Sequence, residues 1–158
     1  MAEFDNFVNE LQHTLIERVK AAYGEEAYER WRTLPHRGEP ASANCRGAST
    51  GTCGDTITIF LTIEDDTVCD AGFATDGCGS SQISGSMAAE LAIGKRCEDL
   101  TDITGEVVRD RLGGLLEEDE HCAWLAANAL HDAVGDYYKR ALRRTDNSRK
   151  QTLPPETP

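Results

Sequence analysis

A pair of strand-like segments joined by a very short connection sets the strongest limit on how this chain folds. Residues 56–63 alternate almost perfectly between threonine and large aliphatic side chains, as expected of a half-buried strand. Residues 68–75 form the second segment, and only the polar residues 64–67 lie between the two. So short a connection predicts an antiparallel hairpin. We expect Cys69 and Phe73 on one face of the second strand, with Cys69 packed in the core.

Helical periodicity precedes and follows this hairpin. The spacing of apolar residues predicts helices over residues 3–23, 25–31, 80–93, 102–112 and 121–143. Residues 34–54 are rich in Pro, Gly, Ser and Ala and are expected to form a loop or a loosely extended segment. Because the helices are segregated from the strands, their order favours an α+β domain in which helices pack on one face of a small antiparallel sheet.

The overall charge argues against two classes of partner. The formal net charge is −12, so the chain lacks the basic surface that binds nucleic acid or an anionic membrane. The acidity is compatible with docking onto a basic protein, although solubility alone would explain it. No apolar run is long enough to span a bilayer, and the acidic N-terminus does not fit a secretory or mitochondrial leader. The sequence therefore predicts a cytoplasmic protein.

Six cysteines need a chemical explanation in a reducing compartment. They are Cys45, Cys53, Cys69, Cys78, Cys97 and Cys122. Since no secretory signal is present, metal or redox chemistry explains them better than a disulfide framework does. The sequence contains no Cys-x-x-Cys pair, so a metal site would have to gather its ligands from distant segments.

Three of these cysteines lie at junctions between predicted elements. Cys53 comes just before the first strand, Cys78 links the second strand to a helix, and Cys122 begins the last helix. Side chains at such junctions can converge at one end of the sheet. The positive end of a helix dipole should lower the pKa of the Cys78 and Cys122 thiols and favour the thiolate that metal and sulfur chemistry requires. Three thiolates leave one place on a tetrahedral metal, or on a two-iron cluster, for Asp55 or His121.

Each of these residues also has a purely structural explanation. Buried thiols are common in protein cores, and an aspartate in a glycine-containing loop often stabilises a turn. The glycine-rich junctions favour a function for the cysteines and for Asp55, whereas the two explanations for His121 are balanced. Cys97 is expected to be structural or incidental, and Cys45 to be a stray thiol in a loop or an accessory sulfur carrier. The remaining histidines are expected at surface or packing positions: His13, His36 and His131.

Three short motifs, taken in order, resemble those of the IscU/NifU-type iron–sulfur scaffold proteins. They are Cys53-Gly54-Asp55, Gly77-Cys78-Gly79-Ser80, and His121-Cys122 followed by Ala123-Trp124-Leu125-Ala126. The segment Pro35-His36-Arg37-Gly38 is a weaker match and looks like a degraded form of the family's Asn-Pro-Arg-Asn segment. Together these motifs divide the chain into an N-terminal helical extension (1–27), a scaffold domain (28–144) and a polar, proline-containing tail (145–158) that is expected to be disordered.

The resemblance implies an α+β fold with a three-stranded sheet and a function in iron–sulfur cluster assembly. It implies that a cysteine desulfurase supplies persulfide sulfur, that an iron donor supplies iron, and that a transient [2Fe–2S] cluster passes to recipient apoproteins. Cys122 resembles the persulfide acceptor, and Cys53 and Cys78 resemble cluster ligands. Asp55 resembles the labile fourth ligand, and His121 an alternate one. Such a scaffold is not a turnover enzyme, and a cluster-bridged homodimer is compatible with it.

Some features of that family are absent from this sequence. The Leu-Pro-Pro-Val-Lys segment read by a dedicated Hsp70-type chaperone is replaced by residues 115–120, so the sequence gives no support for that partner. The spacing from Cys78 to Cys122 has no room for the insertion found in zinc-dependent sulfur-transfer relatives. The alternative function is nevertheless a zinc-dependent sulfurtransferase that accepts persulfide from a cysteine desulfurase, because Zn²⁺ accepts the same mixed ligands.

Overall fold

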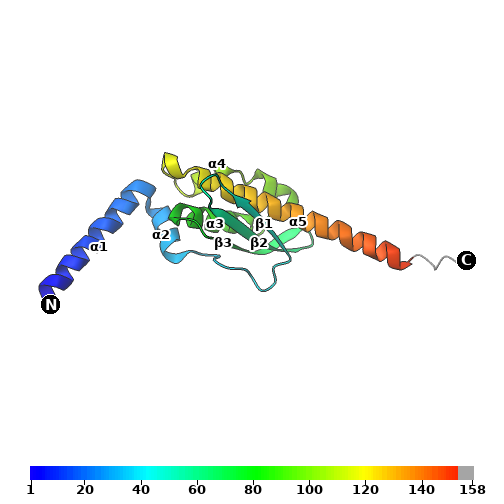
Figure 1. The fold of residues 1–158 in the computed structure, drawn as a ribbon, viewed down its shortest axis with the longest axis horizontal. Helices are drawn as coiled ribbons and strands as arrows, with labels where there is room; N and C mark the ends of the chain where they lie inside the picture. The colour runs from blue at the N-terminus through cyan, green and yellow to red at the C-terminus, as the bar shows by residue number, and fades with distance from the viewer. Residues whose placement is uncertain (153–158) are drawn as a thin grey trace, which may run out of the picture.

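The computed structural model describes residues 1–152 and contains a three-stranded antiparallel sheet (Figure 1). Its strands are β1 (Cys45–Thr50), β2 (Thr56–Glu64) and β3 (Thr67–Thr75), in the order β1-β2-β3. The two-residue turn between β2 and β3 places both of its aspartates, Asp65 and Asp66, at positive φ. The predicted antiparallel hairpin and the α+β class are confirmed.

Helices lie before and after the sheet along the chain. Helices α1 (Ala2–Tyr23) and α2 (Glu25–Thr33) precede it, and α3 (Gly79–Ala92), α4 (Gly105–Arg111) and α5 (His121–Thr152) follow it. Short 3₁₀ turns, η1 (Cys97–Asp102) and η2 (Glu117–Asp119), connect the later helices. No helix among the described residues has both the length and the apolar character needed to cross a membrane.

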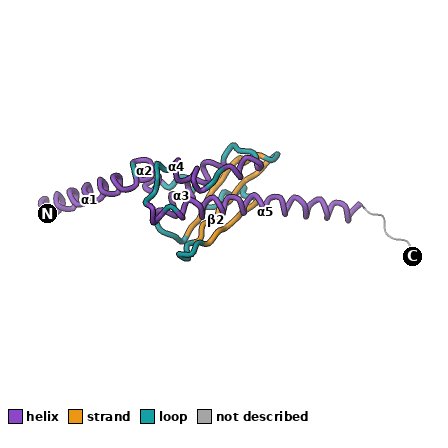
Figure 2. Tube along the Cα trace, turned by 90° about the horizontal axis from the view of Figure 1, so that it is seen from above, coloured by secondary structure: helices purple, strands orange, loops and turns teal. Residues whose placement is uncertain are grey.

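The core lies between the sheet and helices α3 and α5, which contact each other as they cross one sheet face (Figures 1 and 2). The aliphatic side chains of β2 that alternate in the sequence, Ile57, Ile59 and Leu61, are fully buried there. Strand β1 lies so close to α5 that a Cβ on Gly47 would come within 2.0 Å of the Ala133 nitrogen. Glycine is therefore required at position 47 for this contact.

Residues 34–54 were expected to form a loop or a loosely extended segment, but part of this range, Cys45–Thr50, forms the regular strand β1. Its sequence is small and polar, so it carries little intrinsic strand signal. The strand forms because β2 and α5 provide partners on both sides, including Asp132 and Asp136 of α5, whose carboxylates accept hydrogen bonds from β1 backbone nitrogens. Cys45 is also not a loop residue: it begins β1 and is buried, and this burial raises the pKa of its thiol to about 11.

Cys69 does not pack in the core as we expected. The pairing of β2 with β3 shifts at Thr62 and Ile63, so that Thr62 faces Asp70 while Ile63 faces Val68. The residue between these partners is Cys69, which is extra in the ladder and exposed. Val68 takes the buried position instead. A bulge of this kind reverses the face on which a side chain lies, and simple alternation cannot anticipate it.

Helix α5 continues beyond residue 145, where a disordered tail was expected to begin, and ends at Thr152. The added turns contain Arg149, Lys150 and Gln151, which are good helix formers, and Thr145 donates a side-chain hydrogen bond to the Ala141 carbonyl. The first proline that could stop the helix is Pro154. Residues 153–158, the rest of that expected tail, lie outside the described residues.

The two N-terminal helices differ in how they contact the rest of the fold. Helix α2 is fixed to the body by Arg30, which is buried and forms an ion pair with Glu90 of α3 and a 3.1 Å hydrogen bond to Ser86. Helix α1 instead extends away from the body, and none of its described residues is buried (Figure 1). Its predicted amphipathic character therefore leaves an apolar stripe in solvent.

Candidate functional site

The predicted site residues come from three segments that meet at one edge of the sheet. The turn from β1 to β2 carries Cys53 and Asp55, and the end of β3 leads to Cys78. His121 and Cys122 begin α5. Ser81 contacts three of these residues: Asp55, Cys78 and Cys122. His121 contacts Cys122 and Cys53, so all five belong to one connected network.

The turn that carries Cys53 is closed by backbone hydrogen bonds. The Gly51 nitrogen donates to the Asp55 carbonyl at 2.9 Å, and the Gly54 nitrogen donates to the Gly51 carbonyl at 3.0 Å. Gly54 has a φ of 89°, a conformation that glycine adopts without strain. The result is an exposed Cys53 thiol at the tip of a tight turn, with Asp55 directed back toward the sheet edge.

Cys78 is the N-cap of α3, as the sequence indicated. A Cβ on the preceding residue, Gly77, would lie 2.6 Å from both the Asp55 Oδ2 and the Ser81 Oγ. Glycine at position 77 is therefore what allows these two side chains to meet. The Cys78 thiol is exposed, and its Sγ lies 4.0 Å from the Ser81 Oγ.

His121 joins two of the cysteines through one ring nitrogen. Its Nδ1 lies 2.9 Å from the Glu118 carbonyl oxygen. Because a carbonyl only accepts hydrogen bonds, we assign the proton of the neutral ring to Nδ1. The lone pair on Nε2 then faces the Cys53 Sγ and the Cys122 Sγ, each at 3.6 Å. This nitrogen can accept a proton from either thiol or coordinate a metal.

Cys122 differs from the other two site cysteines because it is completely buried. Burial raises the pKa of its thiol to about 11, and the hydrogen bond with Ser81 opposes this shift only in part. The expectation that the helix N-terminus would lower the pKa of Cys122 is therefore wrong: desolvation outweighs the dipole. To react as a thiolate, Cys122 needs a proton acceptor or a bound metal.

Ser81 is the residue that the sequence reasoning missed. Its hydroxyl donates to the Asp55 Oδ2 at 3.1 Å and lies 3.5 Å from the Cys122 Sγ, while the side chain is fully buried. The signal was its position three residues after Cys78 on a predicted helix, since residues three apart share a helix face. Ser81 links the carboxylate to two thiols that lie far apart in the sequence.

The site offers three thiols, a carboxylate and an imidazole, a donor set that suits zinc or the iron of an iron–sulfur cluster. Within residues 1–152, however, no three Cys, His, Asp or Glu side chains already surround a common point at metal-ligand geometry. Coordination would therefore require side-chain rotations, for which Cys53 and Cys78 are free because they are exposed. All six cysteines lie in the described part of the chain and all are free thiols.

Cys97 and the three other histidines have no part in this network of contacts. Cys97 is fully buried in η1, and burial raises the pKa of its thiol to about 12. His131 contacts the Ile103 carbonyl at 3.1 Å through Nε2, which is a packing contact. His13 is exposed on α1, and His36 lies in the segment that pairs with Phe73 of β3.

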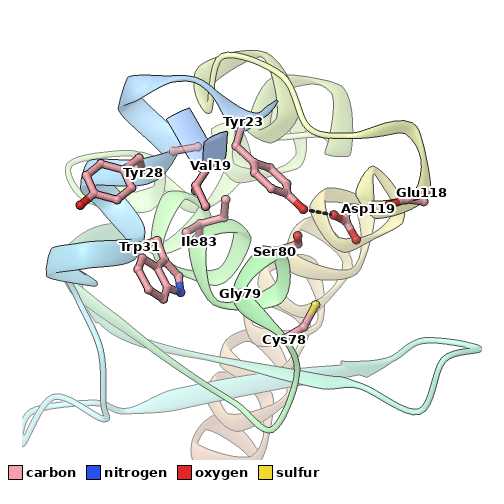
Figure 3. Close-up of a pocket in the computed structure, with 11 residues that line it drawn as sticks. Val19, Tyr23, Tyr28, Trp31, Cys78, Gly79, Ser80, Ile83, Glu118 and Asp119 are labelled. Carbon is pink, nitrogen blue, oxygen red and sulfur yellow. Dashed lines mark hydrogen bonds between the residues drawn. The ribbon is translucent and has the colours of Figure 1, made fainter. Parts of the chain in front are cut away.

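A cavity of about 370 Å³ adjoins the site on the side of the N-terminal helices (Figure 3). Its apolar wall comes mainly from Val19, Tyr23, Trp31 and Ile83, and Cys78 lies at its edge. The Tyr23 hydroxyl donates to the Asp119 Oδ2 at 2.9 Å, and this hydrogen bond to a carboxylate raises the pKa of Tyr23. The end of α1 is thus tied to the acidic turn that precedes His121.

Comparison with known proteins identifies the family. The model of the NifU-like N terminal domain matches residues 22–144. This chain belongs to the NifU-like N-terminal domain family. It is 41% identical over 88 residues to iron-sulfur cluster assembly scaffold protein IscU 1 of Archaeoglobus fulgidus, covering 56% of this chain and 58% of that protein. It is 32% identical over 134 residues to the nitrogen fixation protein NifU of Azotobacter chroococcum, covering 83% of this chain and 43% of that protein.

Solved structures of the NifU-like family have the same fold. The N-terminal part of a nitrogen-fixing NifU-like protein from Brucella abortus superimposes with a TM-score of 0.60 at 18% identity, covering 77% of this chain and 98% of that one. At this identity the match concerns the fold alone. The matched residues span a little over half of the Archaeoglobus relative and less than half of the Azotobacter one.

Proposed function

We propose that this NifU-like chain is an iron–sulfur cluster assembly scaffold. It accepts sulfur from a cysteine desulfurase, binds iron, builds a transient [2Fe–2S] cluster and transfers that cluster to recipient apoproteins. The observation that carries the proposal is the meeting of Cys53, Cys78 and Cys122 with Asp55 and His121 at one edge of the sheet. The proposal agrees with the similarity to the iron-sulfur cluster assembly scaffold protein IscU 1 of Archaeoglobus fulgidus. The chain acts as a carrier and not as a turnover enzyme.

Sulfur enters at Cys122. Its thiolate attacks the outer sulfur of the desulfurase persulfide, so that a new S–S bond forms at Cys122 while the bond between the two donor sulfurs breaks. The donor cysteine leaves as a thiolate. The Cys122 proton passes to the His121 Nε2, 3.6 Å away, and then to the leaving thiolate. Because burial raises the pKa of Cys122 to about 11, this nearby base supplies what the isolated thiol lacks.

Iron and sulfide are the substrates from which the cluster is built. Each persulfide sulfur must take up two electrons from an external electron donor before it becomes sulfide. Cys53, Cys78 and Cys122 hold the cluster, with Asp55 as the favoured fourth ligand and His121 as its alternate. A carboxylate binds iron–sulfur iron more weakly than a thiolate does, which suits a protein that gives its cluster away. Exposed Cys53 and Cys78 leave the cluster accessible to a recipient.

The alternative function is a zinc-dependent sulfurtransferase at the same residues. One feature of the geometry favours it: His121 already faces two thiols, and imidazole with thiolates is a common zinc ligand set. In that case Zn²⁺ would lower the pKa of the thiols, and persulfide would be accepted and passed on without iron. Zinc could also occupy the site in protein isolated without added iron.

The partners follow from this chemistry: a cysteine desulfurase, an iron donor and recipient apoproteins. An Hsp70-type chaperone is not among the proposed partners, because residues 115–120 do not match the segment that it reads. The cytoplasmic location stays a prediction.

Sulfur transfer from a purified cysteine desulfurase tests the proposal. The chain is incubated anaerobically with desulfurase and cysteine, and the persulfide is located by mass spectrometry of peptides. We expect persulfide on Cys122, and loss of this product in Cys122→Ser but not in Cys69→Ser, which alters an exposed thiol outside the site. Transfer to Cys69, or to no cysteine, would contradict the sulfur step. Equal stimulation of the desulfurase by zinc-loaded, iron-free chain would favour the sulfurtransferase.

A further inference from the structure

The short turn that precedes His121 lies at the surface and has no buried side chain to fix it. It comprises Glu117–Asp119. Within it, the Asp119 nitrogen donates to the Leu116 carbonyl at 2.8 Å. Among the described residues, one side-chain hydrogen bond reaches this turn from a distant part of the chain: the Tyr23 hydroxyl donates to the Asp119 Oδ2 at 2.9 Å (Figure 3). The position of the turn therefore depends on Tyr23.

The same turn supplies the acceptor that orients the His121 ring. The His121 Nδ1 lies 2.9 Å from the Glu118 carbonyl oxygen. That oxygen and the Asp119 nitrogen belong to one planar peptide unit, so a contact that holds Asp119 also holds the acceptor. If the acceptor moved, the ring could rotate or carry its proton on Nε2. The Nε2 lone pair would then no longer face the Cys122 Sγ, 3.6 Å away.

Tyr23 is itself firmly placed, although it belongs to the exposed helix α1. Its ring is partly buried and packs against the core, and it forms one wall of the cavity between the N-terminal helices and α3 (Figure 3). The hydrogen bond to the carboxylate raises the pKa of Tyr23, so the hydroxyl keeps its proton and donates at neutral and mildly alkaline pH. Hydrogen bonds to a charged acceptor are roughly twice as strong as neutral ones. Tyr23 thus connects the core to the turn.

An ion pair on the other side of the turn is a weaker constraint. Arg109 lies 3.8 Å from Glu120, and its Nε also donates to the neighbouring Asp110. Ion pairs between solvent-accessible side chains contribute little to stability. Glu120 also follows the turn, one residue beyond the peptide unit that carries the acceptor. The Tyr23 hydrogen bond is therefore the main side-chain contact that fixes this acceptor.

We propose that Tyr23 and Asp119 are positioning residues for sulfur acceptance. Their hydrogen bond fixes the Glu118 carbonyl, which holds His121 with its Nε2 directed at the Cys122 thiol. This inference rests on the proposed function, in which His121 takes the Cys122 proton as the persulfide sulfur arrives. It extends the site to a residue 96 positions before Asp119 in the sequence.

The tautomer of His121 tests the positioning step without any sulfur chemistry. Nitrogen-15 NMR of the full metal-free chain, reduced and at pH 8.5, distinguishes a ring protonated on Nδ1 from one protonated on Nε2. We expect mainly the Nδ1–H form in the wild type. In Tyr23→Phe the ratio of Nδ1–H to Nε2–H should fall by about tenfold, because the net effect of one such hydrogen bond on an equilibrium is of that order. Tyr28→Phe removes a hydroxyl from a residue that lines the same cavity and should leave the ratio unchanged.

The rate of persulfide transfer tests the functional step. In single-turnover assays with saturating desulfurase, Tyr23→Phe and Asp119→Ala should each slow persulfide formation on Cys122 by about two- to tenfold, the smaller value applying if nearly every wild-type ring is oriented. The double variant should be no slower than either single one. The half-saturating concentration of desulfurase should not change. Asp119→Asn keeps an acceptor for the tyrosine hydroxyl and should restore both the rate and the tautomer ratio.

Three results would overturn the proposal. An unchanged tautomer ratio in Tyr23→Phe would show that the turn holds His121 without Tyr23. A raised half-saturating concentration with an unchanged maximal rate would assign Tyr23 and Asp119 to the contact with desulfurase. An Asp119→Asn chain that behaves like Asp119→Ala would show that the hydrogen bond is not the cause. If wild-type Cys122 acquires no persulfide, the proposed function fails, whereas the tautomer ratio still decides whether Tyr23 positions His121.

Discussion

Replacing Ser81 with alanine removes the hydroxyl that connects Asp55 to two of the site cysteines. The hydroxyl donates to the Asp55 carboxylate at 3.1 Å and approaches the Cys122 Sγ at 3.5 Å in a fully buried position. A hydrogen bond to a charged group contributes about 1.5–3 kcal/mol to stability. Asp55 is only half-buried and regains water when released. We therefore expect Ser81→Ala to lower the free energy of unfolding by about 1–2 kcal/mol.

Ser84 is a matched control on the same helix. It is also fully buried, but its hydroxyl has no hydrogen-bond partner among the described residues. Ser84→Ala should therefore be neutral, or stabilising by up to about 1 kcal/mol, because it removes an unpaired buried polar group. Urea unfolding of both variants under reducing conditions measures the difference. If Ser81→Ala is as stable as Ser84→Ala, then the Ser81 contacts do not hold the site together.

Three further predictions concern the pKa values and the lability of the site. Burial raises the thiol pKa from 9.0 to about 11 for Cys45, about 12 for Cys97 and about 11 for Cys122. Above pH 9 these thiols ionise in the unfolded chain but stay neutral in the folded one. The free energy of unfolding therefore falls as pH rises from 9 toward 11, by about 2 kcal/mol per thiol at pH 10.5. Urea titrations at pH 8 and 10.5 measure this fall, and a Cys97→Ala chain with an equal pH slope would contradict it. At pH 8, iodoacetamide should alkylate Cys122 at least about 100-fold more slowly than a free cysteine. Peptide mass spectrometry measures the two rates. Equal rates would show that the Cys122 thiol is exposed to solvent and contradict its burial. Asp55→Ala should slow cluster release or protect the cluster from oxygen, measured by the decay of its absorbance, whereas complete loss of binding would make Asp55 indispensable.

The sequence predicted those parts of the fold in which local pattern and tertiary packing agree. The alternation of residues 56–59 matches the burial in β2, which packs against α3 and α5, whereas Phe60 and Thr62 further along the strand are buried as well. Strand β1 escaped prediction because its own residues scarcely favour a strand. Gly47 is needed because β1 packs closely against α5, and this contact exists only in the folded chain. The exposure of Cys69 was not predicted, because the alternation of side chains in the sequence does not reveal a one-residue bulge in the strand pairing.

The candidate site divides in a similar way. The sequence allowed Cys53, Cys78 and Cys122 to be proposed from their positions at junctions between elements. In the structure, His121 contacts Cys53 and Cys122, and Ser81 contacts Cys78 and Cys122. Ser81 could not be ranked above other serines, because its importance depends on a carboxylate and a thiol that reach it from other segments. The pKa of Cys122 was predicted in the wrong direction, since the depth of burial of a helix N-terminus is a tertiary property.

Absorption spectroscopy of the anaerobically reconstituted chain, paired with iron and sulfide analysis, tests the central claim most directly. With ferrous iron, cysteine and a desulfurase, the account predicts the visible charge-transfer bands of a [2Fe–2S] cluster with equal amounts of iron and sulfide. The bands should be lost in Cys53→Ser, Cys78→Ser and Cys122→Ser but kept in Cys69→Ser. A chain that forms no cluster under these conditions, or one that forms it equally well without the three cysteines, would contradict the assignment of this edge of the sheet as the assembly site.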